Sequence, residues 1–523
     1  MNRRAPILKT AFLLILISTL SFAVGALAKN ESKKPNVSED FYKYMNPFVD
    51  ALTYIQDRYV DEEKTKPKDL MYGAIEGMVS TLDPFSQFMS PEDFKEMQVE
   101  TSGEFGGLGI EIGLKDDRLT VITPIEGTPA ERVGLQSGDR IMKIDQEKTD
   151  GMSVTDAVKH LRGKKGTKVI LTLLREGLPE TFEVTIVRDT IKIQSVRFYR
   201  LADDIGYIRV SEFIDNTTND FKSAYQDLEK EKPLKGLIVD LRNDPGGLLT
   251  EAFTVADLFV EKGKIVVSTR GRDKNQNQAF VASGGRKIHG IPIVTLVNEG
   301  SASGSEIVAG AMKDLKKAVL VGTKTFGKGS VQTILPLDNS GGAALRLTTA
   351  KYYTPSGICI HGIGIDPDVE IKNPELTEST LKMYSKRYLE DFAKVLLKEK
   401  LPVTAGMQIP PATIDRFADF CNKKTPRILK SDMRKDAETV ANSLVLELVR
   451  RQLGEKDARR VAIERDRQVH VAEDILKNGG KIPAKYAGMR PKKKAMTSKS
   501  KKASAPALTP TPVEGSDEPP ESK

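Results

Sequence analysis

The stretch IPIVTLVNEGSASGSEIVAG, residues 291–310, decides the fold of this 523-residue chain. It opens with an apolar, β-branched run that predicts a buried strand over 291–297. A turn of small residues follows, and an apolar periodic segment that begins near Ser303 predicts a helix to about residue 316. A strand that runs through a short turn into a helix is the repeating unit of an α/β sheet.

The same alternation of strand and helix occurs on both sides of this stretch. We expect strands at 205–210, 236–241 and 318–321, helices at 219–230 and 249–260, and further β structure at 330–337 and 343–353. Because strands that alternate with helices pair in parallel, residues 205–370 predict a largely parallel sheet.

The rest of the chain divides by composition. Apolar side chains at spacings of three and four predict helices at 38–60 and 67–81. We expect these helices to form a small N-terminal region that serves as a packing element or a dimer contact. Residues 100–188 combine glycine-rich strands with one helix, 154–162, in a self-contained mixed unit. We therefore expect a mixed α/β multidomain protein with six parts: a signal peptide at 1–28, a helical N-terminal region at 29–99, a β-rich domain at 100–188, an α/β core at 189–372, a helical C-terminal region at 373–490 and a disordered tail at 491–523.

The net charge of +8 does not by itself indicate a nucleic-acid partner. Residues 1–28 carry +3 and residues 491–523 carry +3, which leaves only +2 for residues 29–490. Trp is absent and aromatic residues are 6% of the chain, so few side chains are available to stack on bases. We predict no nucleic-acid partner and interpret the lysine-rich end as a solvated, solubilising run.

The first 28 residues have the pattern of a secretory signal peptide. Two arginines precede an apolar run over 11–26, and Ala26-Leu27-Ala28 has the small-x-small pattern of a cleavage site. We expect cleavage after Ala28 and export to the periplasm or cell envelope. The alternative is an uncleaved anchor that keeps the protein at the membrane.

Cysteine and histidine offer little for redox or metal chemistry. Cys359 and Cys421 can pair in an oxidising compartment, but their positions in the sequence do not say whether they meet. No C-x-x-C is present, and the four histidines include no H-E-x-x-H. We expect neither a metal nor a cofactor.

The turn Gly-Ser-Ala-Ser-Gly-Ser-Glu at 300–306 is the first candidate for chemistry. A serine between a strand and a helix has an exposed hydroxyl, and the backbone amides of the helix N-terminus point to where an oxyanion would form. Ser303 is therefore a candidate nucleophile. The alternative is that Ser303 or a neighbour only caps the helix.

Lys328 is the candidate base. Glycines flank it and its surroundings are apolar, so burial can lower the pKa of its amine from about 10.4 toward neutrality. Gln332 could accept a hydrogen bond from Lys328 without adding a charge. The alternatives are a surface loop lysine and a phosphate-binding loop at 322–329, which the strand expected after it argues against.

These motifs resemble those of the carboxyl-terminal processing peptidases, or tail-specific proteases, over residues 38–372. The family's nucleophile motif is similar to residues 300–310, and its lysine motif is similar to Thr-Phe-Gly-Lys-Gly-Ser-Val-Gln at 325–332. The resemblance implies a ClpP/crotonase-like α/β peptidase core. It implies Ser303 as nucleophile, Lys328 as general base and Gln332 as the residue that orients Lys328.

The resemblance also implies an oxyanion hole formed by two backbone amides. One belongs to Gly304, where family members usually have alanine, a difference from which we expect little consequence. The other belongs to Gly247, in the turn Asp-Leu-Arg-Asn-Asp-Pro-Gly-Gly at 240–247, which resembles the family's D-L-R-x-N-P-G-G. The alternative for the glycines is a tight turn between strand and helix, and both interpretations can hold together.

The unit at 100–188 resembles the PDZ domain of the same family, which captures a peptide C-terminus as an added strand. The resemblance implies that Gly107-Leu108-Gly109-Ile110 holds the terminal carboxylate, with an ordinary glycine-rich hairpin as the alternative. Arg162 resembles a basic position that couples the PDZ domain to the catalytic core in some members. The implied partners are protein substrates with accessible C-terminal tails, and an adaptor or regulatory protein and a homodimer are further hypotheses.

Two functions are consistent with these motifs. One is an exported serine endopeptidase that recognises C-terminal tails through its PDZ domain and cleaves near or upstream of them by a Ser–Lys mechanism. The other is a non-catalytic PDZ adaptor. His361 could suggest a Ser–His–Asp arrangement, but the intact lysine motif favours Lys328.

Overall fold

The computed structural model describes residues 39–115, 117–125, 127–175, 178–285, 288–424 and 428–491. The predicted signal peptide, and the predicted tail beyond residue 491, lie outside these residues. The chain divides into two compact units, residues 1–82 and 83–523.

The first unit is helical where it is described. It contains α2 (Glu39–Arg58), the short η1 (Glu62–Lys64) and α3 (Pro67–Ser80). Pro67 stands at the first position of α3, where its missing N–H leaves no helical hydrogen bond unmade. The two helices agree with those predicted at 38–60 and 67–81. Among the described residues, no helix combines the length and apolar character needed to cross a bilayer.

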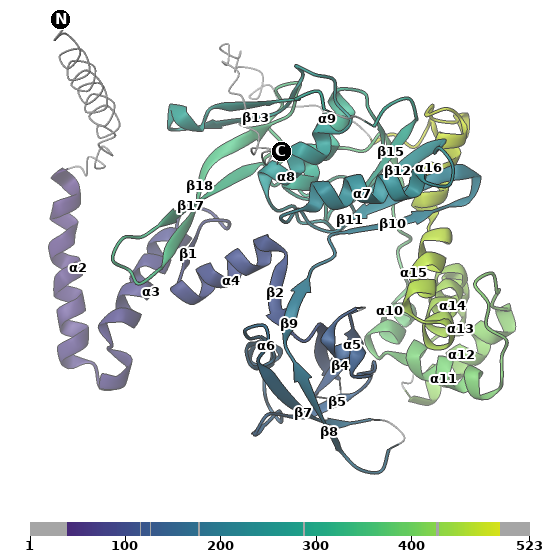
Figure 1. Ribbon diagram of the computed structural model, residues 1–523, viewed down its shortest axis with the longest axis horizontal. Coiled ribbons are helices and arrows are strands. Elements are labelled where there is room, and N and C mark those ends of the chain that lie inside the picture. Colours follow the sequence, from purple (N-terminus) through teal and green to yellow (C-terminus); the bar gives the residue numbers. More distant parts are fainter. Residues whose placement is uncertain are drawn as a thin grey trace, which may run out of the picture. The chain divides into compact units, whose positions relative to one another are not determined.

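The larger unit is built on a six-stranded sheet (Figure 1). In spatial order its strands are β10 (Val196–Arg200), β11 (Ile205–Val210), β12 (Gly236–Asp240), β15 (Ile293–Val297), β16 (Val319–Gly322) and β19 (Val369–Glu370). Strands β11 to β19 pair in parallel, and only β10 is antiparallel to its neighbour. This arrangement confirms the largely parallel sheet expected from the sequence.

Helices cover both faces of this sheet (Figure 1). On one face lie α7 (Thr217–Glu229), α8 (Leu249–Asp257) and α9 (Gly304–Asp314), in one apolar cluster with Leu237 and Val239. On the other lies α16 (Arg467–Lys477), whose Ile475 joins a cluster with Ile238. Because adjacent strand residues point to opposite faces, the apolar side chains of residues 237–239 in the fully buried strand β12 supply both layers.

A second sheet carries the loop that precedes β17. Its strands are β1 (Gln87–Met89), β18 (Ala344–Tyr353), β13 (Ile265–Gly271) and β14 (Gln278–Val281), with β17 (Ser330–Pro336) also paired to β18. The segment 323–329 therefore leaves the first sheet after β16 and enters the second at β17. A strand after Gly329, rather than a helix, removes the basis for a phosphate-binding loop at this position.

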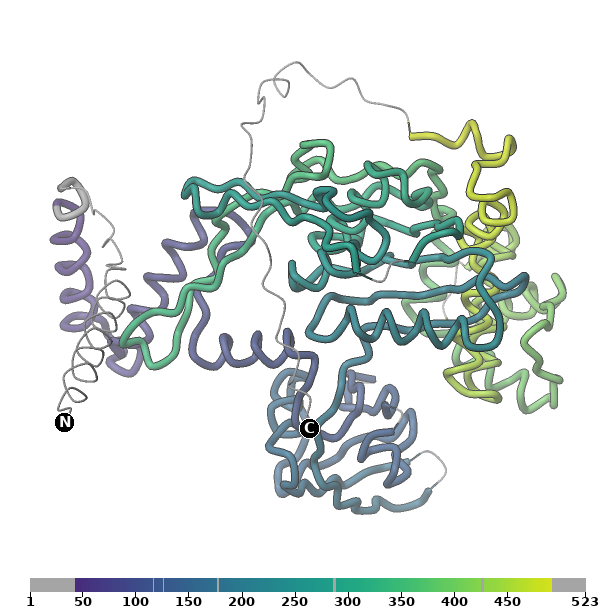
Figure 2. The backbone as a smooth tube through the Cα atoms, turned by 45° about the horizontal axis from the view of Figure 1, so that its top comes forward, coloured from purple at the N-terminus to yellow at the C-terminus, as the bar shows by residue number. Residues whose placement is uncertain are grey.

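Residues 104–192 fold around an apolar core of their own. The sheet order is β3 (Ile110–Lys115), β4 (Arg118–Pro124), β5 (Arg140–Ile144), β7 (Lys168–Leu174) and β8 (Phe182–Val187), with β6 (Glu147–Lys148) on β5 and the helices α5 (Pro129–Arg132) and α6 (Val154–Leu161). The chain enters through β2 (Glu104–Gly107), which follows α4 (Pro91–Ser102), and leaves through β9 (Asp189–Lys192). In Figure 2 the chain can be followed from β2 around this domain to β9, which pairs with β2.

Between β19 and α16 lies a helical region with a separate core. Its helices are α10 (Glu378–Ser385), α11 (Tyr388–Lys398), α12 (Pro411–Lys424), α13 (Lys430–Lys435), α14 (Ala437–Leu453) and α15 (Glu455–Glu464), and the short helices elsewhere in the unit are η2 (Ala202–Asp204), η3 (Lys274–Gln276) and η4 (Ala484–Tyr486). Cys421 is buried in this core, which raises the pKa of its thiol to about 12. Cys359 and Cys421 are both free thiols.

Candidate active site

Ser303 occupies a strained position between β15 and α9. Its backbone has φ 53° and ψ −108°, outside the regions that side-chain-bearing residues favour. Strain of this kind costs about 1–3 kcal/mol and is found mostly at functional sites, where the surrounding structure enforces it. Ser303 does precede the helix as its N-cap residue, so the capping position and the strained turn coincide.

Two turns are joined at this point, the turn 298–305 and the turn 241–247. The Ser301 hydroxyl donates to the Leu241 carbonyl over 2.7 Å. The Asp244 carbonyl accepts the Ala302 amide at 2.9 Å and the Ser305 hydroxyl at 2.8 Å. These bonds over-determine the conformation of the serine turn and place the predicted oxyanion glycines beside it.

Glycine is required at two positions of the second turn because the backbones approach so closely. A Cβ on Gly246, which has φ 101°, would lie 2.7 Å from Ser303 Cβ and 2.7 Å from the Gly304 nitrogen. A Cβ on Gly247, which has φ 140°, would lie 2.1 Å from the Phe213 carbonyl oxygen.

Among the described residues, no backbone hydrogen bond uses the amides of the two predicted oxyanion glycines, Gly247 and Gly304. The hydrogen bonds around Gly247 run from the Phe213 amide to Gly246 and from the Leu248 amide to Phe213, so they do not use the Gly247 amide. As the first residue of α9, Gly304 has an amide that the helix does not satisfy. The structure thus places Ser303, Gly304 and the 246–247 segment next to one another, and their roles as nucleophile and oxyanion hole stay predictions.

The Glu306 carboxylate connects the serine turn to the lysine loop. Its Oε2 accepts the amides of Ser303 at 3.0 Å and Lys328 at 2.8 Å, and its Oε1 accepts the Gly327 amide at 2.7 Å and the Thr325 hydroxyl at 2.6 Å. Burial raises the pKa of Glu306, and these four hydrogen bonds oppose that rise. All four acceptor positions of the carboxylate are used, so the ionised form matches this environment.

Lys328 is half-buried with its ammonium over an aromatic ring. Its Nζ lies 5.2 Å from the centre of the Phe85 ring, in the turn that precedes β1. Burial lowers the pKa of Lys328, and the positive charge of Arg346 lowers it further. Lowering is the direction that general-base work near neutral pH requires. Within the described residues, no hydrogen bond is made by Lys328 Nζ, and its contact with Ser303 stays a prediction.

In this structure the Gln332 amide nitrogen is hydrogen-bonded to residues other than Lys328, and His361 does not take part in a Ser–His–Asp arrangement. The Gln332 amide nitrogen donates to the hydroxyls of Ser330 at 2.9 Å and Thr348 at 3.2 Å. His361 packs edge-on against Phe85, with ring centres 6.3 Å apart, and its buried Nδ1 has no hydrogen-bond partner among the described residues. A Ser–His–Asp arrangement needs a carboxylate on that nitrogen, and the described residues provide none.

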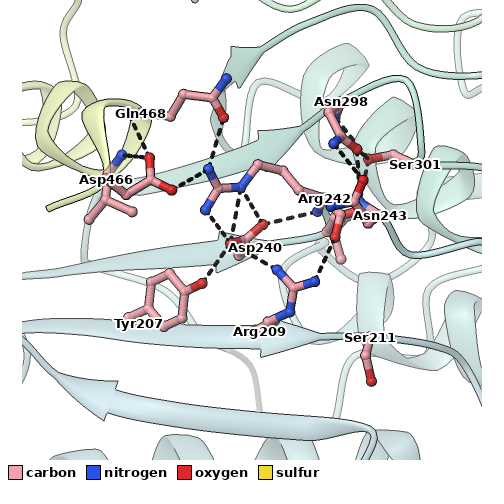
Figure 3. A network of polar contacts seen from close by, with 12 residues as sticks. Tyr207, Arg209, Ser211, Asp240, Arg242, Asn243, Asn298, Ser301, Asp466 and Gln468 are labelled. Atoms are coloured by element: carbon pink, nitrogen blue, oxygen red, sulfur yellow. Dashed lines mark hydrogen bonds and ion pairs between the residues drawn. The ribbon is translucent and has the colours of Figure 1, made fainter. Parts of the chain in front are cut away.

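The strand that leads into the 241–247 turn is fixed by a buried ionic network (Figure 3). Asp240 accepts the Tyr207 hydroxyl at 2.6 Å and three hydrogen bonds from the Arg242 guanidinium. Arg242 also donates to Asp466 at 2.7 Å and to Gln468 at 3.0 Å, both from the start of α16. Burial alone would raise the pKa of Asp240, but Arg242 lowers it below the ordinary value.

Two carbonyls of the predicted carboxylate loop of the β-rich domain are bound by backbone amides of the same domain. The carbonyl of Leu108 accepts the Ala130 amide at 2.9 Å, and that of Gly109 accepts the Ile125 amide at 2.8 Å. Because a peptide group points its N–H opposite to its C=O, the amides of Gly109 and Ile110 face away from the domain. Strand β3, which begins at Ile110, is at the edge of its sheet and pairs only with β4.

Arg162 lies at the end of α6 and connects it to α4. Its Nη1 is 3.1 Å from Glu96 Oε1, and its guanidinium lies 4.9 Å from the centre of the Phe105 ring. Helix α4 follows β1 of the second sheet and precedes β2, through which the chain enters the β-rich domain. The contact between Arg162 and α4 therefore joins the β-rich domain to the segment that leads to it from the second sheet, and the coupling role of Arg162 stays a prediction. The described residues contain no cluster of three or more His, Cys, Asp or Glu that could hold a metal.

Glu306, Asp466 and Gln468 were not predicted from the sequence. Ser303 and Glu306 have the S-x-x-E spacing of a capping box, which could have indicated the bond from Glu306 to the Ser303 amide. No local pattern indicates that the same carboxylate reaches residues 325–328. The contacts of Asp466 and Gln468 join residues more than two hundred positions apart in the chain.

Comparisons with known proteins agree with this architecture. The sequence pattern of peptidase family S41 matches residues 204–371, that of the PDZ domain matches 96–174, and that of the activating protease CtpB N-terminal domain matches 18–93. A carboxy-terminal-processing protease of Bartonella bacilliformis is 43% identical over 366 residues, which are 69% of this chain and 82% of the relative. A probable CtpA-like serine protease of Staphylococcus epidermidis is 37% identical over 369 residues, 69% of this chain and 71% of the relative.

Among solved structures, the photosystem II D1 C-terminal processing protease is 30% identical, with a TM-score of 0.38, over 64% of this chain and 94% of that one. The matched sequence patterns and curated relatives define a serine-type endopeptidase with a PDZ domain ahead of its catalytic core. The chain belongs to the carboxyl-terminal processing peptidases of peptidase family S41. The resemblance seen in the sequence is thereby confirmed, and a non-catalytic adaptor is no longer needed to explain the chain.

Proposed function

We propose that this protein is an exported endopeptidase that binds the C-terminal tail of a protein substrate on its PDZ domain and cleaves near or upstream of that tail by a Ser–Lys mechanism. The observation that carries the catalytic part is the Glu306 carboxylate, which binds the backbone amides of both Ser303 and Lys328. One buried group thus fixes the two segments that must supply nucleophile and base.

In the proposed reaction, the Ser303 hydroxyl attacks the scissile carbonyl and its proton passes to the neutral amine of Lys328. The amides of Gly247 and Gly304 bind the oxyanion. Lys328 then gives its proton to the leaving amine, and a water activated by the same amine hydrolyses the ester. Gln332 would orient Lys328 once the lysine leaves Phe85 for the serine, and its role stays a prediction.

Tail recognition is supported by the free edge of β3 and the outward amides beside it. The apolar side chains of Ile110, Ile112 and Val154 pack around the domain core at this edge, which favours an apolar tail. Binding of an adaptor protein and formation of a homodimer through the helical regions stay hypotheses. Sedimentation of the full chain tests the homodimer, because it measures the mass of the assembly.

The catalytic proposal is tested by digesting a protein with an apolar C-terminal tail using wild type, Ser303→Ala and Lys328→Ala. The matched control is Lys324→Ala, because Lys324 lies in the same loop but pairs with Asp366 at 3.2 Å. We expect the first two variants to lose at least about a thousandfold in rate and the control to cleave normally. Equal cleavage by all four proteins would reject the assignment.

Export is supported only by the sequence pattern at 1–28. Its test is the N-terminus of the mature protein recovered from cells. A chain that begins at Lys29 supports cleavage after Ala28, and an intact N-terminus found in the membrane fraction supports the anchor instead.

A further inference from the structure

Asp244 is a buried acid of the oxyanion turn that the reaction above does not use. Its side chain is fully buried, and Oδ1 accepts the Gly246 amide at 2.8 Å. Its Oδ2 is buried and has no hydrogen-bond partner among the described residues. The backbone carbonyl of Asp244 binds Ala302 and Ser305 of the serine turn. Asp244 therefore joins the two turns that flank the proposed oxyanion hole.

A carboxylate in such a place is poorly tolerated, because one of its oxygens has lost water and gained no donor. Protonation of Oδ2 removes the charge and leaves the Oδ1 contact to Gly246 intact. Burial raises the pKa of Asp244 to about 8, against the hydrogen bond from the Gly246 amide to Oδ1.

The charged neighbours of Asp244 come from β11 and the segment after it. Glu212 raises the pKa of Asp244 through its negative charge, and Arg209 lowers it. From α9, Asp244 meets the neutral hydroxyl of Ser305. The nearest acid on α9, Glu306, is bound to the lysine loop and the Ser303 amide. No cation is hydrogen-bonded to Asp244 among the described residues.

We propose that Asp244 is a positioning residue that works as a neutral carboxylic acid, and that loss of its proton sets the alkaline limit of peptidase activity. Gly246, bound to Oδ1, packs directly on Ser303 and the Gly304 amide. A negative charge at Asp244 would oppose the negative charge that develops on the substrate oxygen at Gly247 and Gly304. The inference rests on the proposed roles of Ser303 and Lys328.

Two ionisations then act in opposite directions. Lys328 must lose its proton to serve as base, so activity rises with pH through the lowered pKa of Lys328. Asp244 must keep its proton, so activity falls as pH rises through a pKa of about 8. The proposal requires the lowered pKa of Lys328 to lie below that of Asp244, and the pH profile of kcat/KM is then bell-shaped, with its descending limb set by Asp244.

The test compares the pH profile of kcat/KM for tail-bearing substrate between wild type, Asp244→Asn and the control Asp338→Asn, an exposed acid in the loop after β17. Asparagine keeps an acceptor for the Gly246 amide and cannot ionise. Each profile is scaled to its own maximum, so the descending limb alone is read. We expect the limb of Asp244→Asn to vanish or move at least about one pH unit upward, with Asp338→Asn unchanged. A folded Asp244→Asn with the wild-type limb would overturn the proposal.

A second variant keeps the test decisive if Asp244→Asn does not fold. Glu212→Gln removes the acid that raises the pKa of Asp244, so the descending limb should move to lower pH while the rising limb stays. An unmoved descending limb in folded Glu212→Gln would count against Asp244 in the same way. Failure of the proposed mechanism is recognised separately, because Ser303→Ala would then still cleave the substrate.

Discussion

The backbone amides of Ser303 and Lys328 donate to one and the same oxygen atom, Oε2 of Glu306, over 3.0 and 2.8 Å. The two residues belong to different parts of the fold, since Ser303 precedes α9 and Lys328 precedes β17. A shared acceptor fixes the distance between their backbones while the two side chains remain free to move. The Lys328 side chain lies over Phe85 while its backbone is held by the same carboxylate oxygen as the backbone of Ser303.

Replacing Glu306 by glutamine should separate the two segments. Glutamine has the same shape, but its amide nitrogen is a donor and must face amides that also donate. Loss of two charge-assisted hydrogen bonds should lower kcat by about 10²–10³-fold. Affinity for a tail peptide should stay unchanged, because the PDZ domain is separate from this contact.

The control for this substitution is Glu299→Gln, since Glu299 follows β15 and accepts the hydroxyl of Thr323 rather than an amide of Ser303 or Lys328. Steady-state kinetics and peptide anisotropy supply the two readouts. If Glu306→Gln and Glu299→Gln show the same kcat, the carboxylate has no positioning role.

Phe85 should set the position of the rising limb of the pH profile. A cation over an aromatic face is stabilised by about 0.5–2 kcal/mol, which holds Lys328 in its charged form. Phe85→Leu removes that stabilisation, so the pKa of Lys328 falls further and the limb moves about 0.4–1.5 pH units lower. Phe326→Leu, in the same loop as Lys328 but 60% exposed, is the control and should leave the limb unmoved. A limb that moves to higher pH in Phe85→Leu would contradict this assignment.

The sequence was sufficient for those parts of the fold that depend on local periodicity. The strand expected at 205–210 is β11, and the turn between strand and helix around Ser303 lies where the small residues predicted it. These features depend on residues that are close together in the sequence, so the spacing of apolar side chains is enough to predict them. The glycines of the 240–247 turn are likewise explained by close backbone approach.

Contacts between segments that are far apart in the sequence could not be predicted from local periodicity. The helix α16 covers one face of the catalytic sheet, although its residues follow six helices that form their own core. The position of Lys328 over Phe85, and of Gln332 on Ser330 and Thr348, depends in the same way on how the two sheets meet.

The start of α16 should matter for catalysis as well as for stability. Asp466→Asn keeps the N-cap of α16, because asparagine caps as well as aspartate, but it weakens the bond to Arg242. We expect a loss of about 1–3 kcal/mol in the free energy of unfolding and a lower kcat, because Arg242 leads into the oxyanion turn. Thermal or urea unfolding and kinetics are compared with Asp457→Asn, an exposed acid on α15. Equal stability in the two variants would show that the ion pair contributes nothing.

Tail binding should fail when a methyl group is added at Gly109. This residue has φ 78°, and a Cβ there would lie 2.2 Å from Thr128 Cβ, so alanine forces the carboxylate loop to move. Gly127 has a nearly equal φ of 75° with nothing within 4 Å of its added Cβ, which makes Gly127→Ala a control for backbone strain alone. We expect Gly109→Ala to weaken the binding of an apolar tail peptide at least about tenfold, measured by fluorescence anisotropy, while Gly127→Ala binds as wild type does. If both variants bind equally well, the tail carboxylate is held somewhere other than the 107–110 loop.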